Sequence, residues 1–193
     1  MKNIVNFSGG KDSTCLLLMM LEKGMQVDDI IFCDTGMEYP EMYKHIEKVE
    51  KYIGRKITRL TGEHSFSYFV TEQKRKKKRN EKECGYGFPR VWSRWCTKSL
   101  KVTPAKEYIK AKYPGEQVQQ YIGIAADEPK RIKSERYPLV DWGITEADAL
   151  KYCYSKGFDW DGLYKHLSRV SCFCCPLQTL NETRYLYRER PEL

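Results

Sequence analysis

The densest group of chemically useful residues in this chain lies close to its first residue. It is the run SGGKDST, which comprises Ser8, Gly9, Gly10, Lys11, Asp12, Ser13 and Thr14. Two glycines let the backbone approach an anion closely, while the hydroxyl groups and the lysine add donors and a cation. A short apolar run precedes the loop and a longer helical one follows it. The run therefore predicts a phosphate-binding loop, with an ordinary glycine turn as the alternative.

This loop differs from two common phosphate loops. The Walker A loop needs Gly-Lys followed directly by Ser or Thr, whereas Asp12 follows Lys11 here. The glycine spacing also fails to match the dinucleotide fingerprint G-x-G-x-x-G.

Cysteines form the second group of reactive residues. Cys172, Cys174 and Cys175 fall within four positions, and Cys96 lies in an earlier segment that an α/β fold can bring to them. Four thiolates suit either a tetrahedral Zn²⁺ or a [4Fe–4S] cluster, and iron–sulfur is slightly favoured. Cys84 is an alternative fourth ligand, because Cys174 and Cys175 are adjacent. A redox or core role is the alternative to metal binding.

The other cysteines and the histidines predict no further site. Cys15, Cys33 and Cys153 fall in apolar segments and are expected in the core. No His-Glu-x-x-His pair is present, which argues against a histidine-based metalloenzyme. The histidines that this concerns are His45, His64 and His166.

Charge and hydropathy narrow the class of protein. The 193 residues carry 34 Lys+Arg against 26 Asp+Glu, a net charge of +8, and 41% of them are hydrophobic. The longest apolar run, Cys15 to Leu21, is far shorter than the roughly 20 residues of a membrane-spanning helix. No secretory signal pattern opens the chain. We therefore expect a folded cytoplasmic protein with reduced thiols and no membrane partner.

Much of the positive charge lies in one segment. Residues 74–83 hold seven cations and two carboxylates, and they account for five of the eight excess charges. Lys74–Lys82 could contact the phosphates of tRNA or another nucleic acid, with nearby aromatic side chains stacking on bases. The alternative is a solvated helix end with those aromatic side chains in the core. The residues concerned are Tyr86, Phe88, Trp92 and Trp95.

Alternating strands and helices must position these groups. We expect strands at Lys2–Phe7, Asp29–Cys33, Lys56–Leu60 and Val118–Ala125. Helices are expected from the glycine loop to Gly24, and at Pro40–Gly54, Ser65 to about Lys78, Thr103–Tyr113, Thr145–Gly157 and Gln178–Arg190. This pattern is typical of a doubly wound α/β fold, with a mainly parallel sheet and helices on both faces. One domain over residues 1–193 is predicted, with a cysteine-rich segment at about 165–193.

The glycine loop closely resembles the PP-loop of the adenine nucleotide α-hydrolase superfamily. Three later segments resemble its phosphoadenosine phosphosulfate (PAPS) reductase branch, and together they cover roughly residues 2–135. These segments are Asp34-Thr35-Gly36 with Tyr39-Pro40-Glu41, Arg94-Trp95-Cys96-Thr97, and Gly123 to Glu128. The reductases carry a terminal Glu-Cys-Gly motif that is absent from this chain. Either the reaction differs or the tail lies outside the sequence.

The resemblance implies a Rossmann-like PP-loop fold and a set of binding residues. The loop residues from Ser8 to Thr14 would hold phosphates, and Asp34, Thr35 and Gly36 would lie near the adenosine. Lys11, Asp12 and Asp34 are the candidate catalytic residues, and Asp12 or Asp34 could bind Mg²⁺. Asp12 could instead cap the helix. Arg131 and Lys130 could contact phosphate or sulfate, with a surface role as the alternative.

Three functions follow from the resemblance. The preferred one is adenylation of a substrate by ATP, which releases pyrophosphate, followed by sulfur transfer at the cysteine centre. The second is reduction of PAPS or a similar sulfonucleotide with release of sulfite. Either reaction implies a protein that donates sulfur or electrons. The third is a module that binds a nucleotide or nucleic acid without catalysis.

Overall fold

The computed structural model describes residues 1–74, 85–132 and 135–193. The chain divides into two compact units, and each is described by itself. The first unit comprises Met1–Phe32, Tyr39–Arg59 and Tyr113–Ser171, and the second comprises Cys33–Glu38, Leu60–Lys112 and Cys172–Leu193. The expectation of a single domain stays a prediction.

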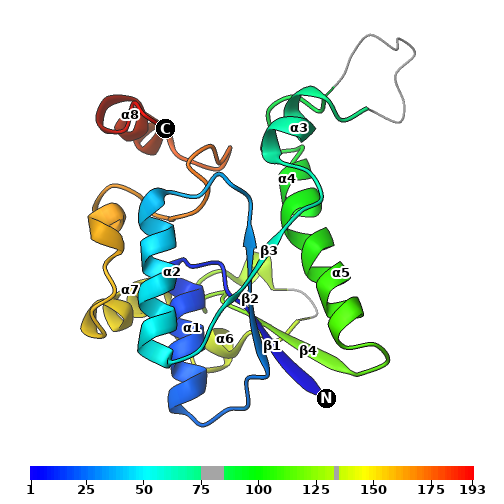
Figure 1. Ribbon diagram of the computed structural model, residues 1–193. Helices are drawn as coiled ribbons and strands as arrows, with labels where there is room; N and C mark the ends of the chain where they lie inside the picture. Colours follow the sequence, from blue (N-terminus) through cyan, green and yellow to red (C-terminus); the bar gives the residue numbers. More distant parts are fainter. Residues whose placement is uncertain (75–84, 133–134) are drawn as a thin grey trace. The chain divides into compact units, whose positions relative to one another are not determined.

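Four strands form one sheet in the order β3-β2-β1-β4 (Figure 1). Their bounds are β1 Lys2–Asn6, β2 Asp29–Asp34, β3 Thr58–Thr61 and β4 Val118–Ile122. β1 pairs in parallel with both neighbours, and its Val5 lies opposite Ile30 of β2 and Tyr121 of β4. Ile4 and Val5 are fully buried, as expected for a strand covered on both faces. The predicted parallel α/β fold with surrounding helices is confirmed.

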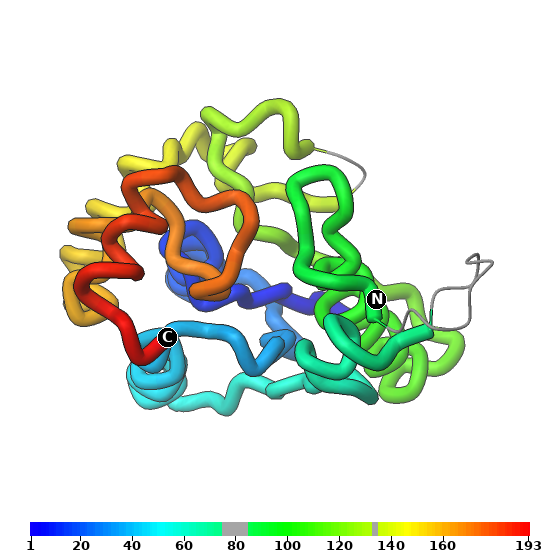
Figure 2. The backbone as a smooth tube through the Cα atoms, turned by 90° about the horizontal axis from the view of Figure 1, so that it is seen from above, coloured from blue at the N-terminus to red at the C-terminus, as the bar shows by residue number. Residues whose placement is uncertain are grey.

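The described residues of the first unit form four helices and two 3₁₀ segments. They are α1 Lys11–Glu22, α2 Pro40–Ile53, α6 Pro138–Asp141 and α7 Glu146–Ser155, with the short 3₁₀ segments η2 Pro129–Arg131 and η3 Trp160–Lys165. α2 begins with Pro40 and ends before Gly54, which adopts φ = 65°, as the sequence predicts. α1 packs against α7, and α2 packs against η3. Figure 2 shows α1 and α2 nearly end-on, with similar axis directions.

The second unit is mainly helical in its described part. It contains α3 Phe66–Thr71, the continuous run α4 Trp95–Thr97, η1 Lys98–Val102 and α5 Thr103–Lys112, and finally α8 Leu180–Glu189. η1 is a π-helical turn directly before Pro104, which lacks the N–H needed to continue an α-helical pattern. A capping box between Thr179 and Glu182 begins α8.

Several predicted bounds are wrong. The helix expected from Ser65 to about Lys78 ends at Thr71 in the described residues. The helix expected at Thr103 does begin there, as α5, but α4 and η1 precede it directly and were not predicted. The strand expected to reach Ala125 ends at Ile122, because Gly123 lies against the first turn of α1. A Cβ atom on Gly123 would come within 2.6 Å of the Ser13 backbone nitrogen. Within the described residues, no helix is long and apolar enough to cross a membrane.

The start of α7 provides a test of the fold. The Thr145 hydroxyl accepts the Asp148 N–H at 3.2 Å, and the Asp148 carboxylate accepts the Thr145 N–H at 3.1 Å. Thr145→Ala should lower the free energy of unfolding by about 1 kcal/mol in urea titrations. Thr145→Ser should retain most of the stability of the wild type, because serine keeps the capping hydroxyl. Equal stability of the alanine variant and the wild type would contradict this role.

Candidate functional site

The glycine loop joins β1 to the first turn of α1. Gly9 adopts φ = +79° and lies against Met42 so closely that a Cβ atom there would overlap its sulfur. The Lys11 N–H donates to a tyrosine hydroxyl, and the Thr14 N–H donates to the Gly10 carbonyl. For the N–H groups of Asp12 and Ser13 between them, the described residues provide no acceptor. These two N–H groups lie in the first turn of α1, at the positive end of the helix dipole, and can donate hydrogen bonds to an anion.

Hydroxyl groups inside the loop hold its curvature. Ser8 Oγ donates to Ser13 Oγ at 3.0 Å, and Ser13 Oγ donates to the Gly10 carbonyl at 3.0 Å. The Ser8 N–H also donates to Ser13 Oγ at 3.2 Å. The alternative role of Asp12 as a helix cap is wrong, because Gly10 occupies the cap position and no side chain of the cap residue accepts a hydrogen bond from the first turn.

Aromatic residues of η3 hold the loop from outside. Trp160 Nε1–H donates to the Gly9 carbonyl at 2.8 Å, and the Tyr164 hydroxyl accepts the Lys11 N–H at 2.7 Å. Trp160 adopts φ = 52°, which is an unusual conformation for a bulky residue. Because both bonds go to backbone atoms of the loop, η3 determines where the loop lies. Sequence reasoning missed both residues, since nothing near them predicts a contact with residues 9–11.

A buried histidine supports the other side of the loop. His45 of α2 is 3% exposed, bonds Thr14 Oγ1 through Nε2 at 2.9 Å, and stacks on Trp160 at 4.2 Å between ring centroids. Burial lowers the pKa of His45 to about 3. The imidazole is therefore neutral at physiological pH. It is a structural support for Thr14, a role that its isolated position in the sequence did not predict.

Three carboxylates gather beside the loop. One oxygen from each of Asp12, Glu128 and Glu146 lies within 4.8 Å of the others. Lys11 Nζ lies 2.6 Å from Glu146 Oε1 and 3.4 Å from Asp12 Oδ2, and the Lys11 side chain is only 6% exposed. The N–H of Glu146 donates to the Asp127 carboxylate at 3.0 Å, which orients the start of α7. Oxygen ligands in this arrangement suit a hard divalent cation such as Mg²⁺.

The protonation of Asp12 reflects this crowding. Its Oδ1 atom is buried and has no hydrogen-bond partner within the described residues. Burial raises the pKa of Asp12 to about 6, Lys11 partly opposes this rise, and the charges of Glu146 and Glu128 add to it. An added divalent cation would favour the charged carboxylate. The predicted Mg²⁺ ligand Asp12 thus lies in a suitable group, whose other members, Glu128 and Glu146, the sequence did not reveal.

Arg131 lies at the outer side of the carboxylate group. Its Nη1 donates to both oxygens of Glu128, at 2.6 and 2.7 Å, and its side chain is 41% exposed. The neighbouring Lys130 is exposed. Arg131 therefore positions Glu128 in this structure, and its expected contact with phosphate or sulfate stays a prediction.

Asp34, Thr35 and Gly36 belong to the second unit. The Asp34 carboxylate accepts the Gly36 N–H at 2.9 Å and forms a tight turn in which Gly36 adopts φ = +72°. Thr35 Oγ1 donates to Glu38 Oε1 at 3.0 Å and lies 3.4 Å from Cys172 Sγ. Thr35 thus faces the cysteine loop. The roles of these three residues toward a nucleotide stay predictions.

Glu38 and Cys172 form the centre of a buried polar group in the second unit. Cys172 Sγ–H donates to Glu38 Oε1 at 3.4 Å, and Lys101 Nζ lies 3.7 Å from the same oxygen. The Glu38 side chain is 1% exposed, and its Oε2 has no partner within the described residues. Although burial alone would lower it, the pKa of Lys101 is raised by Glu38 and Cys172. This group is polar, buried and incompletely satisfied.

The cysteine loop is compact, but its thiols are spread. The Cys175 N–H donates to the Cys172 carbonyl at 3.0 Å, and burial raises the pKa of Cys172 and of Cys174 to about 12. Among the described residues, the acidic group of the first unit is the one set of three possible ligands within 4.8 Å. No three of the sulfur atoms of Cys96, Cys172, Cys174 and Cys175 therefore lie within 4.8 Å of one another, and the role of these residues as metal ligands stays a prediction. Cys84 lies outside the described residues.

The remaining cysteines lie where expected or nearly so. Cys15 and Cys153 are fully buried, and Cys33 is half-buried. The basic segment falls mostly outside the described residues, and its predicted contact with tRNA or another nucleic acid stays a prediction. Lys74, its first residue, is exposed.

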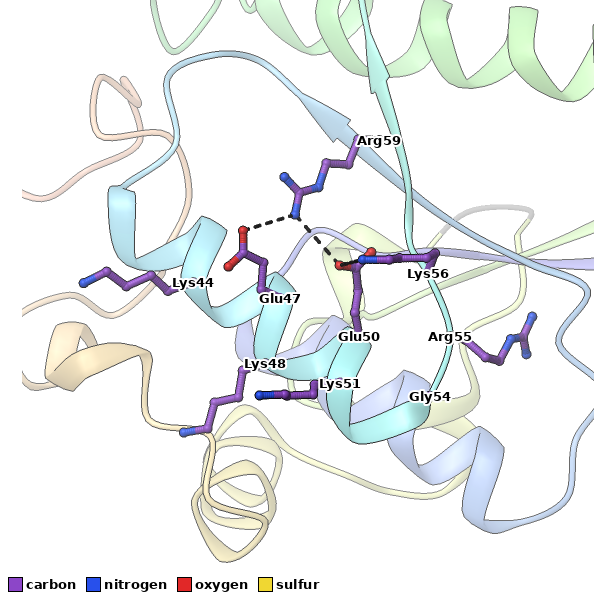
Figure 3. Close-up of a pocket in the computed structure, with 9 residues that line it drawn as sticks. All are labelled: Lys44, Glu47, Lys48, Glu50, Lys51, Gly54, Arg55, Lys56 and Arg59. Atoms are coloured by element: carbon purple, nitrogen blue, oxygen red, sulfur yellow. Dashed lines mark hydrogen bonds and ion pairs between the residues drawn. The ribbon is translucent and has the colours of Figure 1, made fainter.

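An open pocket of about 710 Å³ lies beside the end of α2. Figure 3 shows that its cations diverge, with Lys44 and Arg55 on opposite sides. Arg59 pairs with Glu47 and Glu50, and Lys56 pairs with Glu50 (Figure 3). Because these charges do not converge, the pocket gives no argument for a ligand. Its lining is Lys44, Glu47, Lys48, Glu50, Lys51, Gly54, Arg55, Lys56 and Arg59.

A glycine loop at the start of a helix after the first strand of a parallel sheet defines a class of nucleotide-binding α/β proteins. Comparison with known families identifies the branch. The model of the phosphoadenosine phosphosulfate reductase domain matches residues 2–178, and the chain belongs to this family. The resemblance found in the sequence is thereby confirmed.

The relatives give no closer identification. An uncharacterized protein of Methanocaldococcus jannaschii is 32% identical over 98% of this chain and 39% of its own length. An uncharacterized nin region protein of Escherichia phage lambda is 31% identical over 91% of this chain and 66% of its own length. The chain thus spans less than two thirds of either relative. A PAPS reductase from Candida auris shares the fold, with a TM-score of 0.56, 18% identity, and coverage of 86% of this chain and 78% of its own.

The buried carboxylate Asp12 predicts a pH-dependent stability. Its pKa of about 6 exceeds the ordinary value of 3.8, so the folded state binds the proton more tightly than the unfolded state. Above pH 6 the charged group destabilises the fold, and this cost disappears as the pH falls toward 4. With chelator present, Asp12→Asn should therefore raise the free energy of unfolding at pH 8 by about 1–3 kcal/mol, and by less at pH 4.

Urea titrations of Asp12→Asn and of wild type at pH 4 and pH 8 measure the difference in their free energies of unfolding. His45 is present in both proteins, so its own titration cancels in this difference. The matched control is Asp141→Asn, because Asp141 is exposed. A stability difference between Asp12→Asn and wild type that is independent of pH would contradict the assignment.

Proposed function

We propose that this protein cleaves ATP between its α- and β-phosphates and transfers the adenylyl group to an acceptor oxygen, with pyrophosphate as the leaving group. The observation that carries this proposal is the position of Asp12, Glu128 and Glu146 beside the glycine loop. A family that is named for a phosphoadenosine phosphosulfate reductase supports an adenosine nucleotide as the ligand.

The three carboxylates beside the glycine loop help to distinguish an ATP reaction from the reduction of a sulfonucleotide. Lys11 and Arg131 offset two of the three negative charges beside the phosphate loop, and the remaining negative charge repels a polyphosphate unless a further cation neutralises it. A magnesium nucleotide meets that condition, and Mg²⁺ would compensate the charge that develops on departing pyrophosphate. Reduction of a sulfonucleotide requires instead a thiol that attacks sulfur. The acidic group therefore favours ATP chemistry over sulfonucleotide chemistry.

Residues of the first unit have separate tasks in this reaction. The N–H groups of Asp12 and Ser13 bind phosphate oxygens, and the buried Lys11 supplies a fixed positive charge next to them. Trp160 and Tyr164 hold the loop in position through its backbone. The substrate oxygen forms the new bond to the α-phosphorus as the bond to the bridging oxygen breaks, and pyrophosphate carries away the electron pair.

The cysteine loop is proposed as the centre for a following sulfur-transfer step. Two thiolates on one zinc ion lie about 4 Å apart, since each Zn–S bond is about 2.3 Å. The cysteines of a [4Fe–4S] cluster bind different irons and lie farther apart. Because no three of the sulfur atoms of Cys96, Cys172, Cys174 and Cys175 lie within 4.8 Å of one another, the cluster is proposed as the centre and Zn²⁺ as the alternative. A protein donor of sulfur or electrons belongs to this proposal.

Sulfonucleotide reduction is the second candidate, favoured by the family match. It uses one of the cysteines as the nucleophile and yields sulfite. Release of sulfite from PAPS, with thioredoxin supplied, would favour this reaction over adenylation.

The products formed from ATP test the proposed reaction. We expect AMP and pyrophosphate, formed only with Mg²⁺ or Mn²⁺, when the protein is incubated with candidate acceptors and the nucleotides are separated by chromatography. Glu128→Gln and Glu146→Gln should each lower the rate at least 10-fold, because each removes one charged ligand. The control Glu63→Gln changes a highly exposed carboxylate and should leave the rate unchanged. Formation of ADP and phosphate would contradict the proposal.

The metal content tests the cysteine centre separately. Protein purified without oxygen should contain iron and sulfide and absorb visible light, and Cys172→Ser and Cys175→Ser should lose both. Cys33→Ala is the control, because Cys33 is half-buried in the same unit but outside the cysteine loop. A colourless, metal-free protein with intact circular dichroism would refute this centre without affecting the ATP reaction.

A further inference from the structure

A short hairpin in the second unit presents large apolar side chains to solvent. The backbone groups of Arg90 and Ser93 exchange hydrogen bonds of 3.2 and 2.9 Å, so that Val91 and Trp92 form the two-residue tip. Trp92 is 80% exposed, Val91 is 56% exposed, and the preceding Phe88 is 58% exposed. Three exposed apolar residues within five positions are more than the scattered single ones of an ordinary surface.

The base of this hairpin is firmly held. The N–H of Tyr86 donates to the Phe69 carbonyl at 2.7 Å, and that of Gly87 donates to the Val70 carbonyl at 3.1 Å. These bonds attach the segment to α3. Gly85 fits closely there, because a Cβ atom would overlap the Val70 carbonyl. The hairpin therefore projects from a docked backbone segment.

Aromatic packing fixes the hairpin from its other end. Trp95 Nε1–H donates to the Gly87 carbonyl at 3.1 Å. The Trp95 ring lies 5.2 Å from Phe66 and 5.5 Å from Phe69, measured between centroids. Two tryptophans three positions apart thus differ completely: Trp95 packs inside the unit, and Trp92 faces solvent. Packing explains Trp95 but leaves Trp92 without a role in the fold.

The charged residues of the segment that carries the hairpin are all cations. Residues 85–106 contain five cations and no Asp or Glu. Arg90, Arg94 and Lys98 are exposed, and no ion pair joins them to a carboxylate in the part of the chain that is described. The Arg90 guanidinium lies 5.9 Å from the Trp92 ring centroid. The hairpin segment therefore joins an exposed aromatic ring to exposed cations, one of which lies beside that ring.

We propose that this surface, the Trp92 hairpin, binds single-stranded nucleic acid. Trp92 and Phe88 stack on unpaired bases, while Arg90, Arg94 and Lys98 contact the backbone phosphates. An unpaired nucleotide offers the flat face of its base to the tryptophan and its phosphate to the arginines, which matches both features together. The inference does not depend on the ATP reaction, because it rests on side chains of the second unit alone.

Fluorescence anisotropy with labelled 20-nucleotide probes tests this proposal. The probes are oligo(U) RNA, oligo(dT) DNA and a mixed-sequence duplex DNA, each from 50 to 300 mM KCl. We expect both single strands to bind more tightly than the duplex, with affinity that falls as salt increases. The ratio between RNA and DNA shows whether the 2′-hydroxyl contributes.

Variants separate stacking from charge. Trp92→Ala should weaken binding to the single strands by about 5- to 100-fold, and Trp92→Tyr should restore most of it, because stacking needs an aromatic face. Arg94→Ala should reduce the slope of log affinity against log salt by about one. Tyr187→Ala is the control, because Tyr187 is 85% exposed on α8 and should leave affinity unchanged. Circular dichroism confirms that each variant is folded.

Three outcomes would overturn the inference. They are equal affinity of Trp92→Ala and wild type, duplex binding as tight as single-strand binding, and absence of binding at 50 mM salt. The last result would direct attention to an acidic protein as the partner of the hairpin.

Discussion

The charge balance around Lys11 is the constraint on which the proposed chemistry depends. Its ammonium group is nearly buried and lies between Glu146 and Asp12, at 2.6 and 3.4 Å. Lys11 and Arg131, which pairs with Glu128, supply two positive charges against three carboxylates. Burial, together with the charges of Glu146 and Glu128, raises the pKa of Asp12. The arrangement is thus short of positive charge beside a loop that offers N–H groups to an anion. A divalent cation together with a phosphate would satisfy both needs.

The architecture of the first unit brings these groups together from distant parts of the chain. β1 leads into the loop, and α1 supplies Lys11 and Asp12. Glu128 follows β4, and Glu146 begins α7, which packs on α1. Gly123 allows the end of β4 to approach the first turn of α1 closely. Tertiary packing therefore brings the three carboxylates together. Hydrogen bonds from η3 and α2 hold the glycine loop beside them in position.

Local signals in the sequence were sufficient for some features and insufficient for others. Pro40 and Gly54 marked the ends of α2, and Thr145 with Asp148 marked the start of α7, because capping depends on neighbouring residues. The phosphate loop was also recognisable from contiguous residues. Contacts made across the fold leave no comparable signal. Examples are the Tyr164 hydroxyl on Lys11, the imidazole of His45 on Thr14, and Glu146.

The predicted extent of α3 was wrong for a related reason. Helical spacing in residues 65–78 favoured a long helix, but α3 ends at Thr71, and the N–H groups of Tyr86 and Gly87 bond the carbonyl groups of Phe69 and Val70 in it. The same docking separates Trp95, which packs inside, from Trp92, which faces solvent. In the sequence these aromatic residues form one group, because they lie close together along the chain. Only their tertiary contacts distinguish the core residue Trp95 from the candidate binding residue Trp92.

Electron paramagnetic resonance of bound Mn²⁺ tests whether Asp12, Glu128 and Glu146 hold a divalent cation together with a nucleotide. With ATP present, the account predicts one tightly bound Mn²⁺ per chain, whose spectrum shows coupling to the phosphorus nuclei of the nucleotide. Glu146→Gln should weaken this binding while the fold remains intact. Binding of ATP with the same affinity in the presence and absence of divalent cations, or bound Mn²⁺ without phosphorus coupling, would contradict the account.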